Sequence, residues 1–337
     1  MNKDCFYSDN IYLSLPSLKS EKVALAIDSS ALVYKSIKLY QPFSKKAIYF
    51  KRLLKFLLTN FNFIFKKVLP TQVHIKGDFI IYLEEKLDVD LVSSVYYSTA
   101  NDKVVLQLLS NNKIIGYLKF PLNEVGIMRV KNEKKAIETF SNLGIVDVYR
   151  FADYYNEIPY ILINEVEGTV ENVAHDKLIV LLDKFKKIET FRLNAHPRIL
   201  QLFIGLKNNN LYEESNILES ICNKSTIYYH EVFEHGDFAP WNLISNQIDV
   251  IPFDFEYYEE FGLEYFDIIK YYYQIATLLE NIPVDKILNF INSKIEIDEI
   301  KMLFQVFLIK EILQRKENQS STSFEKHALL VLSNGQK

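Results

Sequence analysis

The chain has few of the residues that cross-link small folds or build metal clusters. Its 337 residues include only two cysteines, Cys5 and Cys222, which lie far apart in the sequence. Two distant cysteines form neither a disulfide framework nor a cysteine-based zinc site, and such sparse usage is typical of a reducing compartment. Because hydrophobic residues make up 49% of the sequence, we expect one large or two moderate hydrophobic cores to hold the fold together.

Long apolar runs are also missing. A membrane-spanning helix needs roughly 18 or more consecutive apolar residues, and no stretch of this chain reaches that length. The longest candidate, residues 56–65, is interrupted by Thr59, Asn60 and Asn62. The first residues, MNKDCFYSDNIYL, hold no apolar segment of signal-peptide length. These absences predict a cytoplasmic protein.

Acidic residues are absent from one segment. Residues 29–77 contain no Asp or Glu but ten Lys or Arg, although the whole chain carries a net charge of −4. Apolar residues recur there at three- and four-residue steps over residues 45–67, which predicts a basic amphipathic helix. We therefore predict that residues 1–75 form an N-terminal extension, separate from the rest of the fold.

The basic helix has three interpretations. It could be a solvated helix packed on the neighbouring lobe. It could instead associate peripherally with an anionic membrane on its inner face, since basic residues are attracted to anionic lipid. Nucleic-acid binding is disfavoured, because no recognisable reader module accompanies the charge.

The remaining pattern changes from strands to helices along the chain. Short β-rich runs separated by turn residues predict an antiparallel meander after residue 76. The predicted strands are 79–82, 91–97, 104–109, 114–120, 147–150 and 160–164, and the predicted helices are 123–142, 170–192, 199–206, 211–222 and 266–279. The last residues, after the polar break at 317–324, are expected to be loosely held. This order predicts an α+β fold with a β-rich lobe at 76–165 and a mostly helical lobe at 166–337.

One motif carries most of the chemical information. Residues 235–243 read HGDFAPWNL, which sets three polar residues in the spacing H-x-D-x-x-x-x-N, and Asp254-Phe255-Glu256 follows at the end of an apolar run. Phosphoryl transfer from a nucleotide requires a carboxylate that aligns the attacking hydroxyl and oxygen ligands that hold Mg²⁺ against the phosphates. Asp237, Asn242 and Asp254 supply these groups in the expected order.

HGDFAPWNL followed by PFDFE resembles the aminoglycoside phosphotransferase and choline kinase superfamily, whose members share a protein-kinase-like fold. There the first motif reads H-G-D-x-x-x-x-N and the second D-x-E or D-x-D. The wording HGDFAPWN is most similar to uncharacterised phosphotransferases of bacterial surface-polysaccharide gene sets. The resemblance covers roughly residues 90–280 and implies a bilobal kinase-like fold, ATP as the nucleotide and Mg²⁺ as the metal.

The resemblance also implies roles for the motif residues. Asp237 corresponds to the catalytic base, and His235 to a residue that braces the catalytic loop by a structural hydrogen bond. Asn242 and Asp254 correspond to the metal ligands, which suits a hard cation that prefers oxygen donors. Glu256 would support a second metal ion or its waters.

Upstream residues complete the implied nucleotide site. Lys119, in GYLKF, resembles the strand lysine that contacts the α- and β-phosphates. Glu133, in Asn132-Glu133-Lys134 at the start of a helix, resembles the glutamate that orients this lysine. Glu165 and Val166, in ILINEVEG, resemble the hinge whose backbone binds adenine. Downstream, Asp267 would fix the catalytic loop from behind.

The turn at residues 98–102 departs from the pattern of many kinases. Kinases often cover the phosphates with a glycine-rich loop, whereas this turn reads STAND and contains no glycine. Ser98, Thr99 and backbone amides could still contact phosphate. The choice between ATP and GTP stays open.

The sequence thus favours a Mg-ATP-dependent phosphotransferase acting on a hydroxyl of a small molecule or glycan, such as a sugar, polyol or glycolipid intermediate of surface-polysaccharide synthesis. A choline, ethanolamine or aminoglycoside kinase is the nearest alternative. Its cationic acceptor would need an acidic or aromatic pocket, for which the sequence offers Glu256, Glu259, Glu260 and Glu264. A degenerate kinase that binds nucleotide and acts as a scaffold is a third interpretation. A protein kinase is disfavoured, because no recognisable activation segment follows Asp254.

Overall fold

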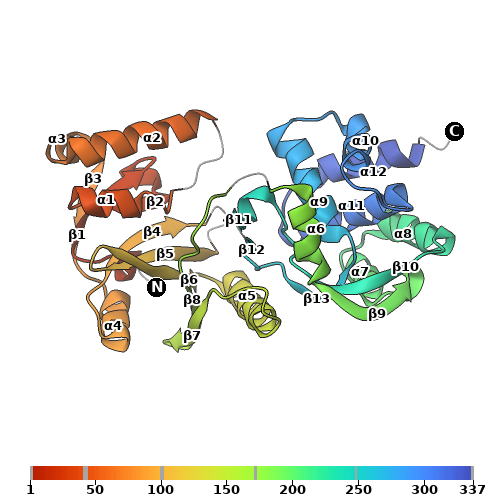
Figure 1. Cartoon of the computed structure of the whole chain (residues 1–337), viewed down its shortest axis with the longest axis horizontal. Coiled ribbons are helices and arrows are strands. Elements are labelled where there is room, and N and C mark those ends of the chain that lie inside the picture. Colours follow the sequence, from red (N-terminus) through yellow and green to blue (C-terminus); the bar gives the residue numbers. More distant parts are fainter. Residues whose placement is uncertain (1–2, 41–44, 99–101, 171–172, 247–248, 335–337) are drawn as a thin grey trace. The chain divides into compact units, whose positions relative to one another are not determined.

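The structure is a computed structural model that describes residues 3–40, 45–98, 102–170, 173–246 and 249–334. The chain folds into two units, unit 1 at residues 1–166 and unit 2 at residues 167–337 (Figure 1). Unit 1 is built around a β-sheet, and unit 2 is mainly helical. The predicted α+β class, with a β-rich first part and a helical second part, is confirmed.

In the described part of unit 1, eight strands form one antiparallel sheet in the order β3-β1-β2-β4-β5-β6-β8-β7. The predicted meander is its centre, where β4 pairs with β5 and β5 with β6. The strands are β1 (Asn10–Leu15), β2 (Val23–Ala26), β3 (Thr71–His74), β4 (Val92–Tyr97), β5 (Lys103–Ser110), β6 (Lys113–Pro121), β7 (Tyr149–Tyr155) and β8 (Ile158–Ile163).

Both faces of this sheet are buried near β1 and β2. Successive strand residues point to opposite faces, and Val23 and Leu25 join one hydrophobic cluster while Ala24 and Ala26 join another. The second cluster packs against α4, and the first packs against α1 and α2. The helices of unit 1 are α1 (Ser30–Ser36), α2 (Lys45–Asn60), α3 (Asn62–Val68), α4 (Asp78–Leu87) and α5 (Glu124–Asn142).

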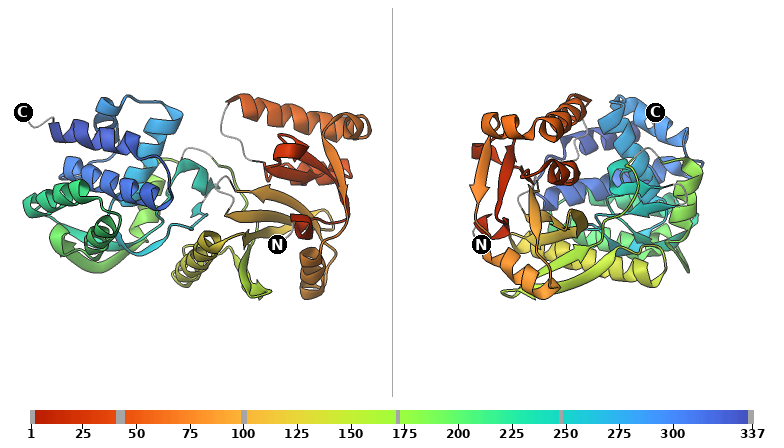
Figure 2. Two further views of the ribbon diagram at one scale, coloured as in Figure 1. Left: turned by 180° about the vertical axis from the view of Figure 1, so that it is seen from behind. Right: turned by 60° about the vertical axis from the view of Figure 1, so that its left-hand side comes forward.

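The first 75 residues are built into unit 1 rather than forming a separate extension. They contribute β1, β2 and β3, and β2 pairs with β4 of the predicted meander. The predicted basic helix is present as two helices, α2 and α3. Both views of Figure 2 show α2 and α3 along one side of unit 1. The prediction missed these three strands.

The predicted strand at 79–82 is wrong, because these residues lie in α4. Their aromatic and β-branched side chains favour strands in general. Here Phe79, Ile80 and Leu83 are buried together on one side of the helix, so packing overrides the local preference. The helix ends at Asp88, which adopts a left-handed conformation (φ 54°).

Unit 2 is mainly helical in its described part. Its helices are α6 (His175–Asp183), α7 (Pro197–Asn208), α8 (Tyr212–Lys224), α9 (Phe266–Gln274), α10 (Ile287–Asn292), α11 (Ile300–Glu317) and α12 (Ser323–Asn334). Its strands are β9 (Lys186–Arg192), β10 (Tyr228–Glu234), β11 (Leu243–Ser245), β12 (Val250–Pro252) and β13 (Glu259–Leu263). They form a sheet in the order β13-β10-β9 and the hairpin β11-β12.

Two predictions for unit 2 are wrong. The single helix predicted at 170–192 is α6 followed by β9, whose residues pair with β10. Residues 323–334 are not loosely held, because they form α12, which buries Glu325, Ala328 and Leu329. Tyr271, Tyr272 and Tyr273 are buried in α9. No described helix has both the length and the apolar character needed to cross a membrane.

Candidate active site

The motif 235–242 forms a loop between β10 and β11, and Gly236 fixes its path. Gly236 has a φ of +79°, in the left-handed region that favours glycine. A Cβ atom at this position would lie 2.0 Å from the backbone oxygen of Tyr257. The loop therefore passes too close to residue 257 for any side chain at position 236.

We predict that Gly236→Ala destabilises unit 2 by about 2–3 kcal/mol, from backbone strain and the displaced Tyr257 carbonyl. Chemical denaturation of the variant and of Gly144→Ala measures this. Gly144 also has a positive φ (+68°), but nothing lies within 4 Å of its Cβ position. Equal destabilisation of both variants would contradict the close approach as the cause.

His235 braces this loop with both ring nitrogens. Its Nε2 lies 2.9 Å from the Phe253 carbonyl oxygen, which can only accept, so Nε2–H is the donor. Nδ1 then accepts the Asp237 backbone N–H at 3.3 Å. With both nitrogens engaged in a fully buried ring, His235 ties the loop to the end of β12. This is the structural hydrogen bonding that the resemblance implied.

Asp267, at the start of α9, holds the loop from the other side. Its two carboxyl oxygens accept the backbone N–H groups of His235 and Gly236 at 2.7 and 3.1 Å. Burial, reinforced by the nearby Glu234 carboxylate, raises the pKa of Asp267 to about 7. A carboxyl group keeps acceptor capacity in either protonation state, so Asp267 can anchor the loop on both sides of neutral pH.

Asn242 lies directly beside Asp237. Its Nδ2 donates to the Asp237 backbone oxygen at 2.8 Å and to Oδ2 of the Asp237 carboxylate at 3.0 Å. Both partners are oxygens, so the amide nitrogen must face them and Oδ1 must point elsewhere. Asn242 Oδ1 therefore takes no part in these two hydrogen bonds, and its role as a metal ligand stays a prediction.

The β11–β12 hairpin brings the second acidic motif back to Asn242. Leu243 pairs with Pro252, and the Phe253 backbone N–H donates to the Asn242 carbonyl at 3.0 Å. Asp254 follows immediately and adopts a left-handed conformation (φ 65°), which is uncommon for a non-glycine residue. Such strain is frequent at functional sites, and it places Asp254 at the open end of the hairpin, next to residue 242.

The chemistry of the predicted ligands is compatible with Mg²⁺. The side chains of Asn242 and Asp254 both carry hard oxygen donors, which this cation prefers. Mg²⁺ typically binds through one or two protein ligands together with substrate phosphates and water. The role predicted for Glu256 in a second metal site stays a prediction.

In unit 1 the structure brings Lys119 and Glu133 together. Lys119 lies on β6 and Glu133 in the middle of α5, rather than at the start of a helix as predicted. Lys119 Nζ lies 2.6 Å from Glu133 Oε1, and the two side chains are 7% and 1% exposed. The glutamate thus holds the lysine in a defined position, which is the pairing that the resemblance implied.

Four further residues were predicted to contact the nucleotide: Ser98, Thr99, Glu165 and Val166. The Ser98 hydroxyl donates to Asp102 and accepts the Lys103 N–H, and phosphate binding by Ser98 stays a prediction. Thr99 lies outside the described residues. At the end of unit 1, the Glu165 carboxylate accepts a hydrogen bond from Lys38 Nζ at 2.6 Å. Adenine binding by the backbone of Glu165 and Val166 stays a prediction.

A buried charge network behind the loop was missed from the sequence. Lys270, on α9, lies 3.6 Å from Asp237 Oδ1 and 2.7 Å from Glu311 Oε2. Lys310 lies 3.5 Å from Glu311 and 2.9 Å from Glu234, and it donates to the Gly236 carbonyl at 3.3 Å. The four network residues are at most 5% exposed: Glu234, Lys270, Lys310 and Glu311.

Opposite charges alternate along this network, which keeps its buried members ionised. Burial alone would neutralise the carboxyl groups. Against that effect, Lys310 and Arg198 hold the pKa of Glu234 below its usual value, and Lys270 and Lys310 do so for Glu311. The two glutamates in turn raise the pKa of Lys310 to about 12 despite its burial. Asp237 is therefore the partly exposed end of a buried ionic network.

The order of elements defines the class of fold. A β-rich unit is followed by a helical unit, which carries a polar loop and, after the β11–β12 hairpin, an acidic motif. This order is protein-kinase-like. Among solved structures, the chain is similar to a thermostable mutant of aminoglycoside phosphotransferase APH(4)-Ia in its apo form. The TM-score is 0.53 at 8% identity, over 76% of this chain and 99% of that chain.

A second structure of that enzyme, a point mutant in a ternary complex with ADP and hygromycin B, gives a TM-score of 0.52 at 9% identity. It covers 77% of this chain and 99% of that chain. At such identities the likeness concerns the fold. No family model matches the sequence, and no curated protein is significantly similar to it.

Proposed function

We propose that this protein is a Mg-ATP-dependent phosphotransferase whose acceptor group is a hydroxyl. One observation supports the proposal: Asn242 donates to both the backbone and the carboxylate of Asp237, and the backbone N–H of Phe253, the residue before Asp254, donates to the Asn242 carbonyl. In this proposal Asp237 supplies the carboxylate, and Asn242 and Asp254 supply the oxygen donors for a metal. These are the protein groups that phosphoryl transfer requires.

Each residue has a role in this proposal. The Asp237 carboxylate would accept a hydrogen bond from the acceptor's hydroxyl and align its oxygen with the γ-phosphate. Asn242 and Asp254 would hold Mg²⁺, which neutralises charge on the phosphates when it is bound. Lys119, oriented by Glu133, would contact the phosphates of the nucleotide. Positioning and electrostatic stabilisation account for most of the expected rate acceleration.

For the acceptor, we propose a sugar, a polyol or a glycolipid intermediate of surface-polysaccharide synthesis. The cationic alternative, such as choline or an aminoglycoside, would need unpaired acidic side chains. Two of the glutamates considered for it are already engaged: Glu259 pairs with Arg198 at 2.9 Å, and Glu264 pairs with Lys186 at 3.0 Å. These pairs favour an uncharged acceptor.

The test is ADP release from ATP against a panel of sugars, polyols, choline and aminoglycosides, with and without Mg²⁺. We expect Mg²⁺-dependent release that one class of uncharged acceptor stimulates. Stimulation by choline or an aminoglycoside alone would replace the proposed acceptor class with a cationic one. Nucleotide binding without ADP release under any condition would favour the scaffold interpretation instead.

A second experiment tests the nucleotide site of unit 1. Because Glu133 is buried beside Lys119, both charges should be removed together, in Lys119→Met/Glu133→Gln. We expect kcat/KM for ATP to fall roughly a hundredfold, the usual order for loss of a preorganised donor. Lys113→Met is the matched control, since this lysine lies on the same strand but is exposed. Unchanged ATP kinetics in the double variant would remove Lys119 from the proposed site.

A further inference from the structure

Helix α2 has apolar side chains on two opposite faces. Leu54 and Leu58, one turn apart, are 3% and 0% exposed and belong to the core of unit 1. Tyr49, Leu53 and Phe56 point the other way and are 72%, 55% and 57% exposed. A surface helix normally carries polar residues opposite its buried stripe, so the outward apolar face is not explained by folding.

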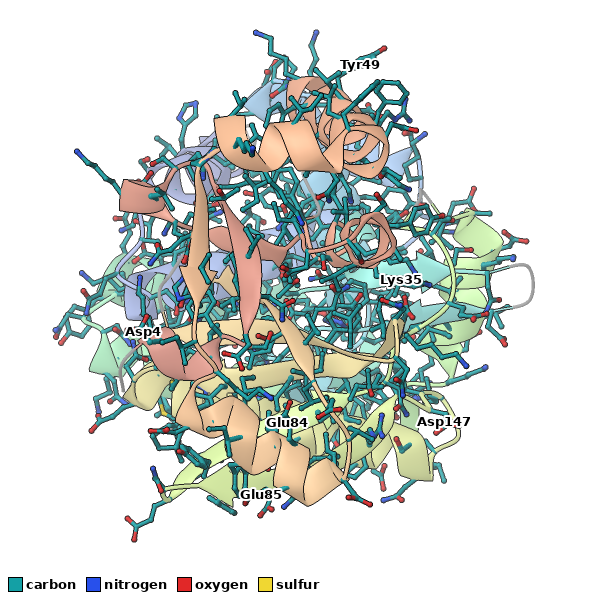
Figure 3. The ribbon with its side chains drawn as sticks, turned by 90° about the vertical axis from the view of Figure 1, so that its left-hand side faces the viewer. Asp4, Lys35, Tyr49, Glu84, Glu85 and Asp147 are labelled. Atoms are coloured by element: carbon teal, nitrogen blue, oxygen red, sulfur yellow. The ribbon has the colours of Figure 1, made fainter. Side chains whose placement is uncertain are left out.

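The exposed apolar face continues beyond α2. Phe61, Ile64 and Val68 are also exposed, and the rings of Phe56 and Phe61 lie 6.2 Å apart. Figure 3 shows Tyr49 projecting from the outer side of these helices. Together these side chains form what we call the α2–α3 face: Tyr49, Leu53, Phe56, Phe61, Ile64 and Val68. Contiguous apolar patches of this kind mark interaction sites.

Charge limits which partner can cover this face. Residues 29–77, which include all of α2 and α3, contain ten basic residues and no acidic one. Lys46 and Arg52 are exposed on α2, and Lys67 is exposed near the end of α3. A second copy of the chain would bring like charges together, which opposes self-association. The partner should therefore be anionic and should also accept large apolar side chains.

We infer that the α2–α3 face docks on an anionic lipid surface. Helices that lie in the membrane interface combine basic residues with Phe and Leu side chains, which enter the boundary between headgroups and acyl chains. Basic residues close to anionic headgroups add electrostatic attraction. The inference goes beyond the proposed phosphotransfer and does not depend on it, because it concerns unit 1 residues outside the candidate site.

Co-sedimentation with vesicles tests the inference. The full chain is expected to bind phosphatidylglycerol vesicles at low salt and to bind phosphatidylcholine vesicles much less. Raising the salt should weaken binding, since salt screens exposed charges. Absence of binding to phosphatidylglycerol vesicles at low salt would overturn the proposal.

Two variants locate the surface. Tyr49→Ser/Leu53→Ser/Phe56→Ser removes outward side chains and leaves Leu54 and Leu58 in the core, so the fold should persist by circular dichroism. Binding should weaken at least about tenfold, given the apolar area lost. Ile188→Ser is the control, because Ile188 is 93% exposed on β9 of unit 2. Equal binding by the triple variant and the wild-type protein would overturn the assignment.

Two charge-reversal variants test how much the basic residues contribute to vesicle binding. Lys46→Glu/Arg52→Glu should reduce binding to phosphatidylglycerol vesicles, whereas Lys207→Glu/Lys224→Glu makes the same charge change on unit 2 and should not. Equal losses in the two would mean that net charge, rather than this face, drives binding, and would overturn the proposal. Analytical ultracentrifugation of the triple variant and the wild-type protein tests the alternative that a second copy of the chain covers this face. If it converts a wild-type dimer to a monomer while vesicle binding is absent, the face is an interface between copies.

Discussion

An Asp237→Asn variant is expected to lose nearly all phosphotransfer while keeping nucleotide binding. Asparagine has the same shape, and a neighbouring amide can still hydrogen-bond to its carbonyl oxygen, so the loop should fold normally. What disappears is the carboxylate that accepts a hydrogen bond from the acceptor's hydroxyl. Removal of a positioned base costs about 10²–10⁴ in rate, and kcat measured by ADP release should fall within this range.

The matched control is Asp249→Asn, which makes the same chemical change at an exposed position near the turn of the β11–β12 hairpin. Its kcat should equal that of the wild-type protein. Binding of a fluorescent ATP analogue should be similar in both variants, because Asp237 is proposed to contact the acceptor rather than the nucleotide. Full turnover by Asp237→Asn would show that another group aligns the acceptor.

The candidate site in unit 2 could be predicted because its residues lie close together in the sequence. His235, Asp237 and Asn242 belong to one loop, and Asp254 follows after one short hairpin. The spacing of these residues in the sequence is therefore enough to predict that they lie in one loop and at the end of the hairpin that follows it. The pairing of Lys119 with Glu133 depends on how α5 packs against β6 and came only through the family resemblance.

Secondary structure was mispredicted where tertiary contacts override local preference. Residues 186–192, KKIETFR, contain good helix formers, yet they form β9 because β10 offers a hydrogen-bonding edge. Residues 79–82 show the opposite error, since their strand-favouring side chains are buried on one side of α4. The pairing partner of residues 186–192 begins only at Tyr228, so local preference does not reveal it.

The buried charge network was missed because a lysine or glutamate is usually solvated. One signal was present, however. In the sequence, Lys310 and Glu311 stand between the apolar residues 306–309 and 312–313 of α11. Charges enclosed by apolar residues on both sides of a helix must be paired with other charges. The sequence does not show which residues provide these partners, because Lys270 and Glu234 lie on other elements.

Loss of Lys270 alone is expected to cost about 3 kcal/mol in unfolding free energy, since it leaves the buried Glu311 carboxylate with the more distant Lys310, 3.5 Å away, as a cationic partner. Denaturation of Lys270→Met measures this cost. Lys301→Met is the control, because Lys301 lies on α11 outside the network and is partly exposed. A stability loss no larger than that of the control would mean that Lys270 is not an essential partner of Glu311.

The double variant Lys270→Met/Glu311→Met distinguishes the effect of Lys270 on protein stability from its effect on the position of Asp237. Replacing a buried ion pair with apolar side chains is often neutral or stabilising, so the melting temperature should recover towards the wild-type value. Asp237 then keeps Asn242 but lacks the cation 3.6 Å from Oδ1. Small displacements of catalytic groups cost up to roughly a hundredfold, so kcat should stay depressed while KM for ATP is unchanged. Recovery of kcat together with stability would make the network a structural feature only, whereas a separate loss of kcat would establish Lys270 as the residue that positions Asp237.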